Sequence, residues 1–318
     1  MGLIPYTLRR IVILLPTAML VALFAFILMH LIPGSPAVVM LGDDATPETI
    51  AQLEKEMGID KPIYVQFQRW FFKLLRGDLG ESIFFDRPVL DLIMGAMGPS
   101  LLLAVLSLGI SLVIGICAGV LAAVKRNAWI DQVSLTSALL GASIPSFWLG
   151  LTLILLFSVK IQIFPTSGYQ SILDSGDITN IKYLILPALA LGLPSSALIT
   201  RLTRSAMLDV LGKDYVNTAR AKGLRERSVI LKHALRNATI PVVTVTSFTF
   251  MNILSRAVVT ESIFRIPGLG SLIVTSIMRR DYPTIQGILL VIAGMYIAVN
   301  LITDLTYTLI DPRIRLGK

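Results

Sequence analysis

The sequence predicts an all-α protein that crosses a membrane several times. Of its 318 residues, 54% are hydrophobic and only 15% are charged, and the mean hydropathy is +0.77. The apolar residues also gather into six stretches, each long enough for the roughly 20 helical residues that cross a bilayer core of about 30 Å. These stretches lie at about residues 9–32, 100–124, 133–160, 183–205, 238–262 and 284–310.

The first apolar stretch follows Arg9 and Arg10, an arrangement that also begins many secretory signal peptides. Its apolar run is longer than the h-region of such a peptide. No small-x-small cleavage site comes after it, and residues 30–34 read His-Leu-Ile-Pro-Gly instead. We therefore expect residues 1–32 to form a cytoplasmic N-terminus followed by a retained first transmembrane helix.

The segment 33–98 is predicted to hold two short helices outside the cytoplasm. One covers residues 47–57 with Thr46 as N-cap, and the other covers 62–75 and ends before Gly77. Hydrophobic side chains recur along the second helix at three- and four-residue spacing: Ile63, Phe67, Trp70, Phe71 and Leu74. We favour a helix that packs on the membrane domain or lies at its interface; the alternative is a docking platform for an external partner.

Small residues and prolines mark the next spans. Gly115 and Gly119 form a small-xxx-small pair, which lets neighbouring helix backbones approach closely. Pro145, Pro187 and Pro194 each remove a backbone donor and are expected to kink their helices. Such bends are typical of helices around a cavity, although rigid bundles contain them too.

Few ionisable or amide side chains fall inside the apolar stretches. They are His30, Lys160, Arg201, Asn252, Arg256, Glu261, Asn300 and Asp304. Several lie near a span end, where a long side chain can reach the interface. Asn252, Arg256 and Asn300 lie deeper, where polar groups normally face a bundle interior or a pathway. These three therefore either line a pathway or form hydrogen bonds between helices.

A turn follows the fifth stretch, signalled by Pro267, Gly268 and Gly270. The next apolar piece, 272–278, is too short to cross a bilayer. We expect it to be interfacial or re-entrant.

The basic residues gather in alternate connections, and this sets the orientation of the chain. They lie at Arg9 and Arg10, at Lys125 and Arg126, from Arg201 to Arg236, and at Arg313, Arg315 and Lys318. The long connection 33–98 is instead rich in Asp and Glu. By the positive-inside rule, both termini and the connection 206–237 are cytoplasmic. Topology thus explains the formal charge of +8, which gives no reason to expect a nucleic-acid partner.

The sequence lacks the common sets of reacting groups. It contains no G-x-x-x-x-G-K-[ST] phosphate loop and no G-x-S-x-G nucleophile elbow. His30 and His233 are expected on opposite sides of the membrane, so they cannot share a metal ion. The single cysteine, Cys117, is expected to be a small packing residue within its helix. We predict no catalytic residue, metal or cofactor in this chain, so any ATP would be bound by another chain.

The basic connection contains the segment 214–237, which reads DYVNTARAKGLRERSVILKHALRN. Asp214 is predicted to be the N-cap of a short helix over 215–222, and Gly223 to take the left-handed position that ends it. A second helix is expected over 225–237. Small residues at Thr218, Ala219 and Ala221 would let a partner surface come close, while Arg220, Lys222, Arg225 and Arg227 stay in water. The alternative is an ordinary loop whose bases only fix orientation.

Ala219, Gly223 and Leu235 are similar to the EAA loop of ABC importer permeases, which docks into the ATPase subunit. Other stretches resemble the dipeptide, oligopeptide, nickel and glutathione permease family, and in particular the first of its two paired permease subunits. These stretches are LRR, LIPGSPA, GIDKPIYVQF, GDLGES, DYVNTARAKG, KHALRNATIPVV, ESIFRIPGLG, RDYP and DPRIR. The EAA pattern has Glu where Asn217 stands and Pro where Arg236 stands, so an acidic coupling residue is not carried over.

The resemblance implies a type I ABC importer permease fold with six transmembrane helices. The permease core would cover 99–310, with the coupling loop at 206–237 and a cytoplasmic tail at 311–318. The chain would pair with a homologous second permease as a heterodimer in the bacterial inner membrane, with two ATPase subunits that bind ATP and Mg and with an extracytoplasmic substrate-binding protein. The expected ATPase-coupling residues are Asp214, Tyr215, Thr218, Ala219, Arg220, Ala221, Lys222 and Gly223.

The function implied is transport of small peptides, driven by ATP hydrolysis in separate subunits. Glutathione, nickel or opine-like solutes are the alternatives within the same importer type. A stand-alone secondary transporter is a distant alternative, because Asp304 is the only acid well inside a span. A membrane enzyme is disfavoured because the reacting groups are missing.

Overall fold

The computed structural model describes most of the chain and leaves out residues 1–2, 32–35, 42–45, 172–175 and 311–318. The described residues are 3–31, 36–41, 46–171 and 176–310. Within these ranges the regular structure is helical, and a single antiparallel bridge joins Glu81 to Pro88. The chain divides into two compact units, one built around 98–271 with 299–310, and the other from 3–97 with 272–298.

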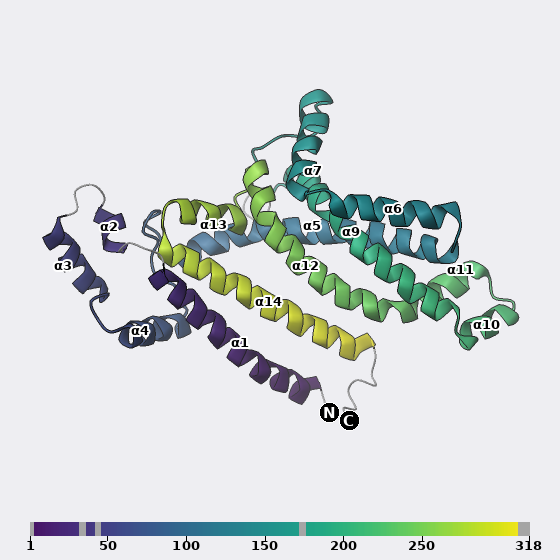
Figure 1. Cartoon of the computed structure of the whole chain (residues 1–318), viewed down its shortest axis with the longest axis horizontal. Coiled ribbons are helices and arrows are strands. Elements are labelled where there is room, and N and C mark those ends of the chain that lie inside the picture. Colours follow the sequence, from purple (N-terminus) through teal and green to yellow (C-terminus); the bar gives the residue numbers. More distant parts are fainter. Residues whose placement is uncertain (1–2, 32–35, 42–45, 172–175, 311–318) are drawn as a thin grey trace. The chain divides into compact units, whose positions relative to one another are not determined.

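The first unit holds the central helices (Figure 1). They are most of α5 (Val89–Val124), then α6 (Trp129–Ser143), α7 (Ser146–Leu153), a π-helical turn (Ile154–Lys160), a 3-10 turn (Ile178–Ile181), α9 (Lys182–Leu211), α10 (Asp214–Ala221), α11 (Glu226–Ser228), a second π-helical turn (Val229–Leu235) and α12 (Arg236–Phe264). Helix α9 packs against α12, α6 and α7. It is therefore the central helix of this unit.

The core of this unit is aliphatic and centred on α9. Leu184 and Leu191 of α9 are fully buried against Leu103 of α5 and Ile253 of α12. Gly119 lets α5 approach α9 closely, because a Cβ added there would come within 2.6 Å of Thr203 Cβ. The packing role expected for the small residues of this span is thus confirmed, and Cys117 on the same helix is exposed instead of packed.

The third apolar stretch is not one straight span. Helix α6 ends at Ser143, and the helix pair meets at a bend of 96°. Ile144 has an extended backbone, with ψ 122, because a residue before proline is disfavoured in the helical region. Pro145 is the N-cap of α7, so the predicted break occurs there. Pro187 and Pro194, in contrast, lie inside α9, which continues through both.

The second unit consists of the N-terminal helices and a return segment of the chain. It contains α1 (Leu3–Leu31), α2 (Pro36–Leu41), α3 (Pro47–Met57), α4 (Ile63–Leu75), the first turns of α5, most of α13 (Leu269–Met278) and the first half of α14 (Tyr282–Ile310). The predicted N-cap of α3 is confirmed: Thr46 and Thr49 form a capping box, and Gly58 ends the helix with φ 73.

The hydrophobic stripe of α4 packs on α1. Phe67 and Trp70 lie with their ring centroids 5.2 and 5.5 Å from that of Phe26, and Gln66 contacts His30 at 3.1 Å. This matches the predicted packing face. Elsewhere in this unit the fully buried Asp281 accepts hydrogen bonds from Ser82 Oγ (2.6 Å), Ile83 N (3.1 Å) and Thr284 Oγ1 (2.7 Å), so it joins the segment after α4 to the start of α14.

Four of the described helices are long and apolar enough to cross a membrane, or five if the bent pair α6 and α7 is one span. The four are Val89–Val124, Ile178–Leu211, Glu226–Phe264 and Tyr282–Thr306. In α1 the apolar part found among the described residues is Val12–Leu28, which is shorter. Six spans with both termini in the cytoplasm stay a prediction, and the tail 311–318 lies outside the described residues.

Candidate functional site

The helix–glycine–helix segment predicted from the sequence exists and begins with α10. Lys213, with φ −80 and ψ 147, is the N-cap, and no side chain caps the helix there. The prediction of Asp214 as N-cap is therefore wrong by one position. Asp214 is the first helical residue, where its negative charge is favourable next to the positive end of the helix dipole.

Gly223 makes the corner after α10. Its φ is +77, the left-handed conformation that the sequence predicts. The N–H of Gly223 donates to Arg220 O at 2.9 Å, and the N–H of Leu224 donates to Ala219 O at 3.4 Å, so the last carbonyls of the helix are satisfied. A Cβ at this glycine would meet no atom within 4 Å, so only the backbone conformation restricts the position.

The inner side of the corner packs on the end of α9. Val216 and Val229 are fully buried and Ala219 is 7% exposed, and Val210 and Leu211 of α9 pack against them. The methyl group of Ala219 thus faces the chain's own core, and a role for this small residue in coupling stays a prediction. The residues 213–229, called the hairpin below, are consequently fixed to α9 by an apolar contact.

Polar contacts close the hairpin on its outer side. Arg220 donates from Nη2 to Glu226 Oε1 at 2.9 Å and from Nε to Oε2 at 3.2 Å. The hydrogen bond from Arg220 to Glu226 raises the pKa of the guanidinium above its ordinary value. Asn237 donates from Nδ2 to the Tyr215 hydroxyl at 2.9 Å. Both contacts join α10 to the segment after Gly223, so the two arms form one rigid piece.

The second arm does not end at Asn237, as was predicted. Helix α11 passes into the π-helical turn and then directly into α12, giving an unbroken helical segment from Glu226 to Phe264. Pro241 lies inside α12 without ending it. No residue in the left-handed conformation interrupts the described chain between 226 and 264. The hairpin is therefore joined covalently to a full-length apolar helix.

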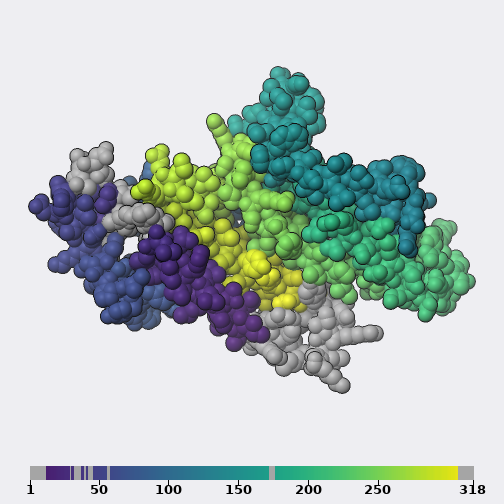
Figure 2. Space-filling view, in the orientation of Figure 1, coloured from purple at the N-terminus to yellow at the C-terminus, as the bar shows by residue number. Residues whose placement is uncertain are grey.

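The hairpin's free surface carries polar side chains and a few apolar ones. Helices α10 and α11 lie at one end of the first unit (Figure 1), and their outer face is visible in Figure 2. Tyr215 and Leu224 are 44% and 42% exposed. Thr218 and Lys222 are exposed on the same side of α10, one turn apart. These side chains are therefore available for contact with another molecule.

The three predicted pathway residues belong to α12 and α14. Asn252 is half-buried and donates from Nδ2 to Phe248 O of its own helix at 2.9 Å. Arg256 is exposed and Asn300 is half-buried. The Asn252 amide thus bonds within α12, and a pathway-lining role for the three residues stays a prediction.

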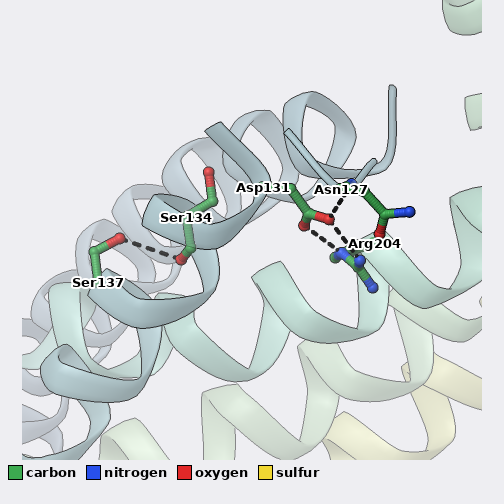
Figure 3. Close-up of polar contacts among 5 residues, drawn as sticks. All are labelled: Asn127, Asp131, Ser134, Ser137 and Arg204. Carbon is green, nitrogen blue, oxygen red and sulfur yellow. Dashed lines mark hydrogen bonds and ion pairs between the residues drawn. The ribbon is translucent and has the colours of Figure 1, made fainter. Parts of the chain in front are cut away.

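The sequence reasoning missed an ion pair between a buried carboxylate of α6 and a partly exposed guanidinium of α9 (Figure 3). Asp131 is 3% exposed and receives two hydrogen bonds from Arg204, of 2.6 Å from Nε and 2.7 Å from Nη2. The N–H of Asn127, whose φ is 62, also donates to Asp131 at 3.0 Å. The pair fixes the corner between α5 and α6 to the helix that carries the hairpin. Its members are 73 residues apart, and nothing local in the sequence connects them.

A second missed feature is the carboxylate of Glu261. It is 1% exposed and accepts hydrogen bonds from Ser100 Oγ (2.6 Å), Gly270 N (2.8 Å) and Ser271 N (3.2 Å). It therefore does not reach toward an interface. The only signal in the sequence was an acidic residue at the end of an apolar stretch, followed closely by two glycines.

Metal binding has no candidate among the described residues, where no group of three or more His, Cys, Asp and Glu side chains could hold an ion. Apolar helices long enough to cross a membrane, together with a hairpin fixed to one of them and exposed on its other face, are the features of a membrane protein that can contact a separate protein at this hairpin.

The chain belongs to the family described as binding-protein-dependent transport system inner membrane component, which matches residues 115–316. The N-terminal region of the same kind of membrane component matches residues 3–94. These two matches together cover nearly the whole chain.

Relatives of this chain carry peptide and glutathione names. A putative peptide transport system permease protein of Brucella abortus is 42% identical over 97% of this chain and 98% of its own length. A probable peptide ABC transporter permease protein of Sinorhizobium fredii is 41% identical, with 98% and 99% covered. The glutathione transport system permease protein GsiC of Escherichia coli is 41% identical, with 98% of each chain covered.

Among solved structures, the MetNI methionine ABC transporter in inward-facing conformations is similar, with a TM-score of 0.58 at 17% identity. The match covers 70% of this chain and 97% of the other, and it shows the type I permease fold. The chain is thus a multi-pass permease subunit of the bacterial inner membrane and not an enzyme, and the ATPase activity lies in separate subunits. Its family implies ATPase and substrate-binding partners.

Proposed function

We propose that this chain is the first of two homologous permease subunits in an importer of small peptides. Relatives named for peptide transport, at 41–42% identity over nearly the full length, support peptides as the first choice of substrate. Glutathione, itself a tripeptide, is the second choice because GsiC is similarly close. Nickel and opine-like solutes, which belong to the same importer type, come after these.

The assembly we propose follows the expectations from the sequence. The chain forms a heterodimer with the second permease, and the pathway lies between them, with Asn252, Arg256 and Asn300 along it. Two ATPase subunits bind ATP and Mg at the cytoplasmic face. The segment 33–98 faces the extracytoplasmic binding protein.

The hairpin is the proposed docking element for one ATPase subunit. The observation that carries this proposal is its rigidity: α10 is packed on α9 through Val216, closed by the Arg220–Glu226 pair, and continuous through α11 with α12. Movement of the ATPase would therefore displace α9 and α12 together, since neither arm can bend independently. Asp214, Tyr215, Thr218, Ala221 and Lys222 would form the contact, and Ala219 and Gly223 would maintain its shape.

Co-purification tests this docking. Thr218→Trp adds bulk to the exposed face of α10, and we expect at least tenfold less ATPase subunit to purify with the permease. Gln68→Trp is the matched control, since Gln68 is exposed on a helix of the other unit. The proposal is wrong if both variants retain the ATPase equally. Uptake of labelled dipeptides and glutathione by the intact importer then distinguishes the two substrates.

A further inference from the structure

Glu261 contacts α5, the end of α12 and the first turn of α13, and all of these contacts lie within the first unit. Its backbone O accepts hydrogen bonds from the N–H of Arg265 and, at 2.9 Å, from the N–H of Ile266. These bonds satisfy the last turn of α12. Its carboxylate accepts from Gly270 N and Ser271 N, the first turn of α13. The same residue therefore ends one helix and caps the next.

The cap at the start of α13 comes from residues distant in sequence. A helix leaves its first N–H groups without intrahelical partners, and these are usually satisfied by the residue just before the helix. Here that residue is Gly268, which has no side chain. The N–H of Leu269 donates to Ser100 Oγ at 2.8 Å, and Ser100 in turn donates to Glu261 at 2.6 Å. The carboxylate oxygens of Glu261 also lie at the positive end of the α13 dipole.

The glycines beside Glu261 are required by the close approach of its carboxylate. A Cβ on Gly268 would collide with the Glu261 carboxyl group and with Ser100 Oγ. A Cβ on Gly270 would come within 2.9 Å of Glu261 Oε2 and would also collide with Val258 of α12. The corner 261–271 is thus tightly packed around the Glu261 carboxylate.

We propose that Glu261 is a positioning residue for transport, whose carboxylate makes the end of α12 and the first turn of α13 a single rigid corner. This inference rests on the proposed function of the hairpin. The hairpin lies at one end of the segment 226–264 and Glu261 lies near the other. With about 1.5 Å of rise per residue, this helical segment carries a displacement over some tens of ångströms. The hydrogen bonds from Gly270 N, Ser271 N and Ser100 Oγ to the Glu261 carboxylate, called the clamp below, would pass this displacement to the first turn of α13.

The test needs one reporter at each end of this segment. Cys117 is first replaced by Ser, because this exposed thiol would react. Lys222→Cys then reports the cytoplasmic end by crosslinking to the ATPase subunit. Met278→Cys, at an exposed position at the end of α13, reports the far end by its labelling rate with and without ATP and vanadate. The complete importer in membranes is used throughout.

Ser100→Ala and Glu261→Gln weaken the clamp, and Ser111→Ala is the matched control. Ser111 is buried on the same helix as Ser100 but donates to Ser107 O and Gly192 O, away from α13. We expect ATP and vanadate to change the Met278→Cys labelling rate severalfold in the parent and in Ser111→Ala. In the two clamp variants this change should fall at least threefold, and peptide molecules imported per ATP should fall with it.

The two proposals fail in different ways. A missing Lys222→Cys crosslink in the parent overturns the docking proposal. If the crosslink forms, two results would refute the clamp. One is a Met278→Cys labelling rate that ATP and vanadate do not change in the parent. The other is a labelling rate that changes in Ser100→Ala and Glu261→Gln as much as in the parent. Ser100→Ala decides the matter if Glu261→Gln does not accumulate, since it removes one hydroxyl and leaves the carboxylate in place.

Discussion

Gly223 shows how the backbone conformation of one residue shapes the hairpin. Its φ of +77 is open to glycine but unfavourable by about 1–2 kcal/mol for residues with a Cβ, and most unfavourable for β-branched ones. Space is not the restriction, since a Cβ there would meet nothing within 4 Å.

Gly223→Val should therefore leave membrane insertion intact but change the path of the hairpin. We expect ATP hydrolysis to continue while substrate uptake per ATP falls severalfold, measured in proteoliposomes of the complete importer. Gly223→Asn is the control, because Asn tolerates the left-handed conformation. If Gly223→Val takes up as much substrate per ATP as the parent protein, the proposed coupling role of the hairpin is contradicted.

For the Asp131–Arg204 pair, the effect of a substitution on stability is expected to depend on charge instead of backbone conformation. Asp131→Ala leaves the partly exposed Arg204 guanidinium without its partner and should destabilise the permease by an amount between the roughly 1 kcal/mol of an exposed pair and the roughly 3 kcal/mol of a fully buried one. Thermal unfolding of the purified importer measures this. Adding Arg204→Met should recover much of the loss, because a well-packed apolar pair avoids the uncompensated charge.

The exposed pair Arg220–Glu226 is the matched comparison for this experiment. Its members are 40% and 54% exposed, so Arg220→Met should cost at most about 1 kcal/mol. If Asp131→Ala and Arg220→Met lower the unfolding free energy equally, burial of the Asp131 carboxylate does not strengthen the Asp131–Arg204 pair.

At the scale of elements, the features set by local sequence were predictable, whereas the contacts between residues far apart in the sequence were not. Thr46 and the stripe on α4 act within one or two helical turns, so the sequence alone indicated where α3 begins and which face of α4 packs. The Asp131–Arg204 pair and the Ser100–Glu261 bond join residues 73 and 161 apart. Such contacts depend on how whole helices pack, which periodicity does not encode.

Helix boundaries were predictable only where a residue dictates them. Gly223 ends α10 as expected. The boundary placed at Asn237 was wrong, because neither Asn237 nor Pro241 stops the helix, which continues to Phe264. The bend at Pro145 was expected, but its size of 96° depends on the packing of α6 and α7 on α9.

The cap of α3 gives a prediction for a single element. Thr46→Ala removes the oxygen that accepts the Thr49 N–H and should destabilise the first turn by about 1 kcal/mol. Hydrogen exchange of the amides in 48–51 should become about fivefold faster, as that energy implies. Thr46→Ser keeps the hydroxyl and should exchange like the parent; equal rates in all three proteins would contradict the cap.

For the whole molecule, the central prediction is the membrane topology. In a Cys117→Ser background, Lys222→Cys should react with an impermeant thiol reagent only from the cytoplasmic side. Glu48→Cys, exposed on α3, should react only from the other side. This follows from the distribution of basic residues. Reaction of both positions from one side would contradict the proposed orientation.

The unbroken helical segment from Glu226 to Phe264 also restricts how this protein can change over evolutionary time. Each added or deleted residue in an α-helix turns everything beyond it by about 100° and shifts it by about 1.5 Å. A single codon gained or lost within α12 would rotate the docking surface out of alignment with Glu261. Length variation among descendants should therefore accumulate in the connections of the chain and be purged from this segment, even where amino-acid replacements are tolerated.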